Sequence, residues 1–149
     1  MIKFQDQTQL QRFKVVFAAL LAIPLVGSLG CGGRATDQVT GTVHFADGSP
    51  LTAGTLMLYG GEDPTVQPRG LIKSDGTFEL TTFGNEDGAP RGTYRVAIVN
   101  AKSAPPADWG ERPFNRQLLI HSKYEKPETS GLEFKIPDNT HWDITVEKP

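Results

Sequence analysis

The residues with the widest chemical repertoire are few in this 149-residue chain, which has a single cysteine and three histidines. His44, His121 and His141 stand on three separated segments, with no HExxH motif or paired-cysteine spacing. A zinc site needs ligands that converge, usually three from the protein where the metal is catalytic. The alternation around His44 and His141 places both on the outward faces of predicted strands. We therefore expect solvated histidines and no bound metal.

The remaining polar candidates are isolated too. Asp75 and Asp87 each stand next to a glycine in a turn-like sequence. Calcium would need more oxygen ligands than either loop offers, so we expect both carboxylates to shape turns. No GxSxG elbow is present, and no histidine lies near the thiol in sequence to activate it. The sequence thus favours no calcium site, no serine or cysteine hydrolase, and no cofactor.

Cys31 ends a segment that is typical of exported proteins. The first 14 residues are polar and carry three basic side chains, and residues 15–26 (VVFAALLAIPLV) are apolar. This apolar run is shorter than the roughly 20 residues that a membrane-spanning helix needs. A basic flank, a short apolar run and small residues before a break describe a secretory signal. The pattern predicts a signal with an apolar helix over residues 1–30 and a polar tether over residues 31–38.

The Gly30-Cys31 junction, followed by two glycines, resembles the lipobox of bacterial lipoproteins. The resemblance implies that the Cys31 thiol receives a diacylglycerol after export. The protein would then be anchored by lipid to the membrane, on the periplasmic or outer face of a bacterial envelope. Ser28 and Leu29 depart from the family, which favours Leu three residues before the cysteine and a small residue two before. An uncleaved or differently cleaved N-terminal anchor, or a buried structural Cys31, is the alternative.

Composition excludes several partners. Apolar residues make up 38% of the chain and charged residues 21%, which is enough apolar surface for one packed domain. Residues 1–30 hold three basic and one acidic side chain, so the rest has 15 − 3 = 12 basic and 17 − 1 = 16 acidic residues, a net charge of −4. An acidic body does not attract nucleic acid. The single cysteine also excludes an internal disulfide.

Alternating apolar residues predict a core built from strands. Ser74-Asp75-Gly76 predicts a tight turn, and Phe78 and Leu80 after it alternate with polar residues. A second run places Tyr94, Val96 and Ile98 on one face. Similar alternation predicts strands at residues 39–45, 51–59, 132–136 and 142–147, with residues 70–72 opening the central hairpin. We expect an all-β, antiparallel β-sandwich of about seven strands.

Several motifs carry a resemblance to a known family. They are Asp-Gly-x-Phe-x-Leu at 75–80, Gly-x-Tyr-x-Val-x-Ile at 92–98, Val-x-Gly-x-Val-x-Phe-x-Asp-Gly-x-Pro-Leu at 39–51, Lys-Tyr at 123–124 and Ser-Gly-Leu at 130–132. The chain resembles planctomycete-type lipoproteins with a carboxypeptidase regulatory-like domain. This implies a transthyretin-like Greek-key sandwich over residues 39–149, acting as a non-enzymatic structural or binding module. The alternative is a hydroxyisourate hydrolase-type enzyme, although the Tyr-Arg-Gly-Ser motif of that family is absent.

Residues 101–117 interrupt the strand pattern with three prolines and no periodicity. A loop of this length in a compact domain is either functional or mobile. It contains residue types that are favoured as interface anchors: Trp109, Arg112, Phe114 and Arg116. These four are the candidate contacts for a glycan or protein partner. We favour the other interpretation, in which the two aromatic residues pin the loop to the sandwich.

Overall fold

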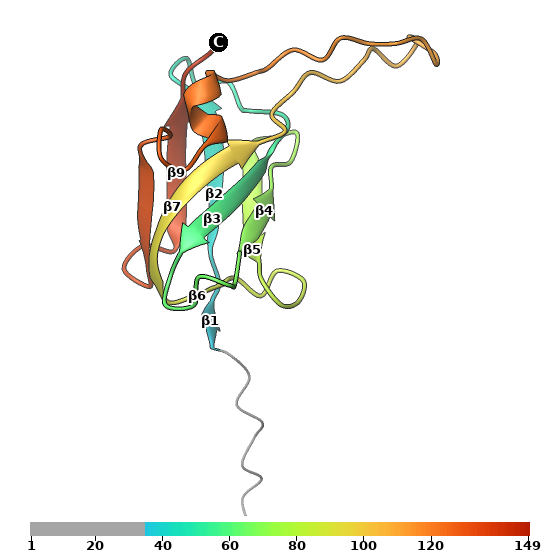
Figure 1. The fold of residues 1–149 in the computed structure, drawn as a ribbon. Helices are drawn as coiled ribbons and strands as arrows, with labels where there is room; N and C mark the ends of the chain where they lie inside the picture. The colour runs from blue at the N-terminus through green and yellow to red at the C-terminus, as the bar shows by residue number, and fades with distance from the viewer. Residues whose placement is uncertain (1–34) are drawn as a thin grey trace, which may run out of the picture. The chain divides into compact units, whose positions relative to one another are not determined.

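A curled sheet of seven strands forms the body of the protein in the computed structural model, which describes residues 35–149 (Figure 1). The strand order is β8-β7-β3-β4-β5-β2-β9. The bounds are Thr40–Phe45 (β2), Thr55–Gly60 (β3), Arg69–Leu71 (β4), Thr77–Thr81 (β5), Gly92–Val99 (β7), Leu132–Ile136 (β8) and His141–Val146 (β9). The predicted all-β fold is confirmed. The predicted signal over residues 1–30 and Cys31 lie outside the described residues.

Three short elements complete the described chain. Strands β1 (Thr36–Asp37) and β6 (Ala89–Pro90) pair with each other at one end of the domain. A 3-10 helix, η1 (Ser122–Glu125), forms where the sequence indicated only a turn. No helix among residues 35–149 has the length and apolar character needed to cross a membrane.

The strands form where alternation predicted them because their apolar sides share one core. Phe78 and Leu80 of β5 are buried, as are Tyr94, Val96 and Ile98 of β7. The turn before β5 also has its predicted chemistry. A carboxylate oxygen of Asp75 accepts hydrogen bonds from the Thr77 amide (3.0 Å) and hydroxyl (2.7 Å), and Gly76 has a φ of 83°.

Trp142 lies at the point where the curled sheet approaches itself. Its ring stacks on Phe134, with centroids 4.1 Å apart and planes 9° from parallel, and contacts Phe78 at 6.1 Å. Its indole nitrogen donates a hydrogen bond to the Asn139 carbonyl (2.9 Å). Because Phe134 belongs to β8 and Trp142 to β9, one aromatic stack joins the two edges of the sheet.

The prediction that all strands are antiparallel is wrong for one pair. Strand β9 runs parallel to β2, with Gly41 beside Trp142 in the register. A Cβ atom at Gly41 would collide with the Trp142 carbonyl and the Phe78 ring, so glycine permits this close approach. Alternation reveals which side chains face the core, but it does not identify a strand's neighbour. Strands β8 and β9 follow each other in sequence, yet they occupy opposite edges of the sheet.

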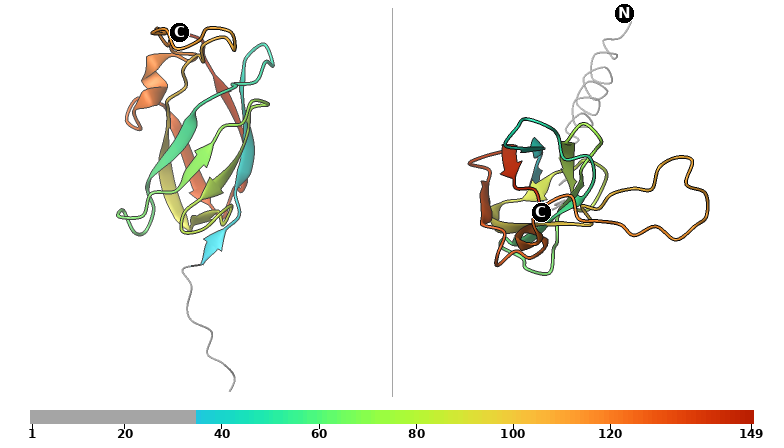
Figure 2. Two further views of the ribbon diagram at one scale, coloured as in Figure 1. Left: turned by 90° about the vertical axis from the view of Figure 1, so that its right-hand side faces the viewer. Right: turned by 90° about the horizontal axis from the view of Figure 1, so that it is seen from above.

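Residues 101–117, which we call the arm, leave the domain at the end opposite β1. The C-terminus and η1 lie at the same end as the arm (Figure 1). Figure 2 shows the arm extending well beyond the sheet in the view from above. Its base is a short ladder, in which the Ser103 amide donates to Gln117 O (2.9 Å) and the Leu119 amide donates to Ala101 O (2.8 Å). The sheet therefore fixes only the base of the arm.

Candidate functional site

The outer face of β2 and β9 gathers titratable side chains that lie far apart in the sequence. His44 Nε2 is 2.7 Å from Asp143 Oδ1, and the Thr42 hydroxyl donates to the same oxygen at 3.1 Å. Beside them, the Thr40 hydroxyl lies 3.1 Å from His141 Nδ1. The parallel register produces this arrangement because it aligns residues 40–45 with 141–146. We call these five residues the β2–β9 cluster.

The contacts of His44 favour the protonated form of its ring. Its Nδ1 lies 3.0 Å from the Phe45 carbonyl, while Nε2 faces the Asp143 carboxylate. Both partners are acceptors, so the two contacts are hydrogen bonds at the same time only when each ring nitrogen carries a proton. The Phe45 carbonyl, followed by Asp143, accordingly raises the pKa of His44 above its usual value. The Thr42 hydroxyl and then His44 lower the pKa of Asp143.

This geometry limits what the cluster can do chemically. A general base needs a ring nitrogen with a free lone pair within reach of a substrate proton. When the His44 ring is protonated, both of its nitrogens donate to acceptors, so this form offers no free lone pair. The pair therefore bridges β2 and β9 across the outer face of the sheet.

His44 lies on the outward face of β2, as expected, and its side chain is 29% exposed, but it also has a partner. Sequence reasoning missed its partner because Asp143 lies 99 positions away and only the parallel pairing brings the two together. His121 lies apart from the cluster, where its Nδ1 accepts a hydrogen bond from the Lys123 amide (3.1 Å) at the start of η1. Within residues 35–149, no group of three or more His, Cys, Asp or Glu side chains is arranged to hold a metal ion.

Asp87 shapes a turn, as the sequence predicted. One carboxylate oxygen accepts from the Thr82 amide (2.8 Å), and the other accepts from the amides of Phe83 and Gly84 (2.9 Å each). Burial acts to raise the pKa of Asp87, but these three backbone donors hold it below its usual value. The Asp87 carboxylate therefore stabilises its own loop.

The aromatic residues of the arm contact each other. Trp109 and Phe114 meet edge to face, with centroids 5.3 Å apart. The Arg112 guanidinium lies over the Trp109 ring at 4.9 Å, and its Nε donates to the Trp109 carbonyl (3.0 Å). Arg116 is exposed. We call Trp109, Arg112 and Phe114 the arm cluster.

The expectation that Trp109 and Phe114 pin the loop to the sheet is therefore wrong. The partly buried apolar residues that pack against the core are Phe45, Leu119, Leu132 and Phe134, and neither arm aromatic is among them. Proline-rich sequence on both sides of Trp109 disfavours strand pairing with the body. The two aromatic side chains are instead buried only in part, against one another.

Comparison with protein-family models, curated proteins and solved structures gives no match. The function must therefore be inferred from the residues and their arrangement.

Proposed function

We propose that this protein is a lipid-anchored module of a bacterial cell envelope that binds a protein partner through its arm and catalyses no reaction. Cys31 is the proposed site of lipid attachment. Five positions separate it from Thr36 in β1, so at most about 18 Å of extended chain would join the lipid to the domain. Strand β1 and the arm lie at opposite ends of the folded domain (Figure 1). An anchored domain could therefore present the arm away from the membrane.

The arm cluster is the observation that carries the binding proposal. Aromatic and arginine side chains dominate the energetics of protein interfaces, most strongly when they are held in place before binding. Arg112 is held by its stack on Trp109 and by the hydrogen bond to the Trp109 carbonyl. Because the cluster stabilises no part of the core, its place at the end of a long projection is best explained by a contact with another molecule.

We also propose the finer fold, a transthyretin-like Greek-key sandwich of the carboxypeptidase regulatory-like type. Its support is that the motif side chains Phe78, Leu80 and Tyr94 all belong to the buried core. The absence of ladder pairing between β8 and β9, which are the two ends of the strand order, also agrees with an open sandwich. A crystal structure with ladder hydrogen bonds joining β8 to β9 would instead establish a closed barrel.

The anchor is tested by Cys31→Ser in cells that export the protein. We expect the substitution to abolish metabolic labelling with palmitate and either release the domain from membranes or leave an unprocessed precursor. Two acyl chains are enough for stable anchoring, so the fraction in the membrane should fall sharply. Unchanged processing and membrane partitioning in the Cys31→Ser variant would contradict the lipid anchor.

The binding role is tested with a photo-crosslinking amino acid placed at Phe114 and, as a control, at Leu71. Leu71 is 70% exposed but belongs to β4, two strands from β7 in the sheet, and is not part of the arm. We expect discrete protein adducts from position 114 that disappear in the Arg112→Ala background, and none from position 71. Adducts that form equally from both positions, or that persist without Arg112, would contradict recognition by the arm. Loss of a measurable enzymatic activity on substitution of His44, His121 or His141 would contradict the non-enzymatic role.

A further inference from the structure

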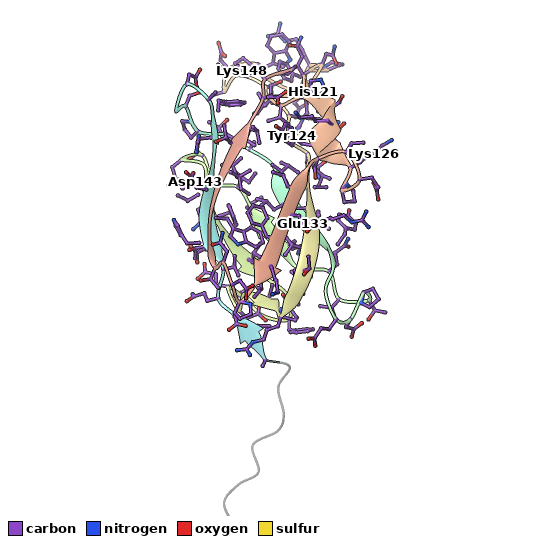
Figure 3. All side chains as sticks on the ribbon, turned by 90° about the vertical axis from the view of Figure 1, so that its left-hand side faces the viewer. His121, Tyr124, Lys126, Glu133, Asp143 and Lys148 are labelled. Carbon is purple, nitrogen blue, oxygen red and sulfur yellow. The ribbon has the colours of Figure 1, made fainter. Side chains whose placement is uncertain are left out.

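A groove of about 420 Å³ opens at the end of the domain opposite β1, apart from the arm cluster. Phe45 of β2, Val146 of β9 and Tyr124 of η1 form its apolar floor. Phe45 and Val146 are paired in the parallel register, so the groove lies where the inward faces of the two strands end. Figure 3 shows Tyr124 and Lys148 toward this end of the domain. The volume is within the range of small-molecule sites.

Two ion pairs lie beside this floor, and three of their four side chains, Asp47, Glu147 and Lys148, line the groove. Lys148 Nζ lies 2.8 Å from Asp47 Oδ2, and Lys123 Nζ lies 2.6 Å from Glu147 Oε1. The Lys148 ammonium is also 5.2 Å from the centre of the Phe45 ring. Hydrogen bonds from Lys148 and Ser49 strongly lower the pKa of Asp47.

The Lys123 pair repeats this arrangement on the other aromatic residue. The Lys123 ammonium lies 5.0 Å from the centre of the Tyr124 ring. Its hydrogen bond raises the pKa of Lys123 and lowers that of Glu147, so both remain charged near neutral pH. Lys123 is not part of the lining but neutralises Glu147, so the two ion pairs together have a net charge of zero.

This combination selects among ligand classes. A strongly charged ligand would be attracted by one member of each ion pair and repelled by the other. It would therefore gain little from long-range attraction. A purely apolar ligand would displace water from Asp47, Glu147 and Lys148, each more than half exposed, and offer no hydrogen bond in its place. A sugar has an apolar C–H face that can lie on aromatic floor atoms, and its hydroxyls can both accept from ammonium groups and donate to carboxylates. We propose that this groove binds a neutral saccharide.

The groove proposal goes beyond the proposed function because it needs neither the arm cluster nor the lipid. Loss of saccharide binding would leave the adducts formed from position 114 unchanged, and loss of the arm contacts would leave the groove intact. The two proposals can therefore fail separately.

The test is an NMR titration of the detergent-solubilised full chain with cellohexaose and N-acetylchitohexaose. Hexagalacturonate serves as an anionic comparison and deacetylated chitohexaose as a cationic one. We expect a neutral hexamer to shift the backbone amide signals of Phe45, Tyr124 and Val146 at millimolar or lower concentration. The charged hexamers should bind more weakly than the neutral hexamer that binds best.

Lys148→Ala and Lys135→Ala form the matched pair of variants. Both lysines are similarly exposed (62% and 61%) and each contacts an aspartate at 2.8 Å, but Lys135 belongs to β8 and does not line the groove. Lys148→Ala should raise the dissociation constant about five-fold or more, because a charged hydrogen-bond donor is removed. Lys135→Ala should leave the dissociation constant unchanged. Three results would each overturn the proposal: no shift with either neutral hexamer up to about 10 mM, tighter binding of a charged hexamer, or equal effects of the two variants.

Discussion

The sheet and the arm hold their aromatic side chains in different ways. In the sheet, Phe78 and Trp142 are almost fully buried in one cluster to which every strand from β2 to β9 except β4 contributes. In the arm, the Trp109 ring contacts the Phe114 ring and the Arg112 guanidinium, and both aromatic side chains remain partly exposed. Burial on the scale of the core stabilises the fold, whereas a small isolated cluster contributes little to it. The comparison shows that the arm aromatics are not explained by stability.

The largest effect is expected in the sheet. Phe78→Ala should lower the free energy of unfolding by about 3–5 kcal/mol, since it removes a ring that is 1% exposed and contacts Trp142. Leu71→Ala is the control, because Leu71 is 70% exposed and its loss should change stability by about 0.5 kcal/mol or less. Urea denaturation followed by circular dichroism measures both variants. Similar values for the two would remove the distinction between core and surface on which the comparison rests.

A smaller effect should come from the β2–β9 cluster on the outer face of the same sheet. The folded-state pKa of His44 is raised, so its stabilising contribution is fully present below its unfolded pKa of about 6.5 and is lost as the pH rises through the folded value. The pKa of Asp143 is lowered, so its contribution is present above about 3.9 and is lost as the pH falls through its folded value. The bridge should therefore be strongest from about pH 4 to just above pH 6.5.

Thermal unfolding at pH 5.5 and pH 9 measures this bridge. His44→Asn should lower the melting temperature by about 1–3 °C at pH 5.5 and by less at pH 9, since both groups are near the surface and water screens the pair. His121→Asn, which changes a histidine outside the cluster, should leave the pH dependence of the wild type in place. A pH dependence that is identical in the wild type and in His44→Asn would show that the bridge contributes nothing.

The smallest effect on stability should come from shortening the arm. Replacing residues 104–116 with Asn-Gly would join Ser103 to Gln117 through a two-residue turn and preserve the ladder at the base of the arm. We expect the free energy of unfolding to fall by less than about 1 kcal/mol, because a shorter loop also costs less closure entropy. Crosslinking through the arm should disappear. An unfolded variant would show instead that the arm is a structural lid on the sheet.

The strands could be predicted because burial on one side of a sheet leaves a period of two in the sequence. Phe78 and Leu80, and likewise Tyr94, Val96 and Ile98, occupy every second position. This pattern predicted β5 and β7 closely. Strands β1 and β6, with two residues each, are too short to show any period. Residues 51–54 were included in β3 by their sequence, yet the strand begins at Thr55, after Gly54 with a φ of 141°.

The candidate sites were less accessible to sequence reasoning. The residues of the arm cluster were selected by type, but their contact with one another depends on how the chain folds back around Gly110, which has a φ of 71°. The groove could not be predicted, since its floor joins Phe45, Tyr124 and Val146 from three distant segments. The one signal that could have indicated the β2–β9 cluster was the matching order of polar residues at 40–44 and 141–145, and this is informative only once parallel pairing is considered.

The parallel pairing of β2 with β9 also has a kinetic consequence. Thr40 and Thr42 contact partners 101 positions later in the chain, so β2 gains this neighbour only after almost the whole domain has been synthesised. Contacts of such long sequence separation slow folding, because the entropy of closing the loop is lost before the contact is formed. A nascent chain that lacks β9 would leave the Phe78 and Phe134 rings without Trp142. Completion of the fold thus depends on β9, the last strand of the described residues.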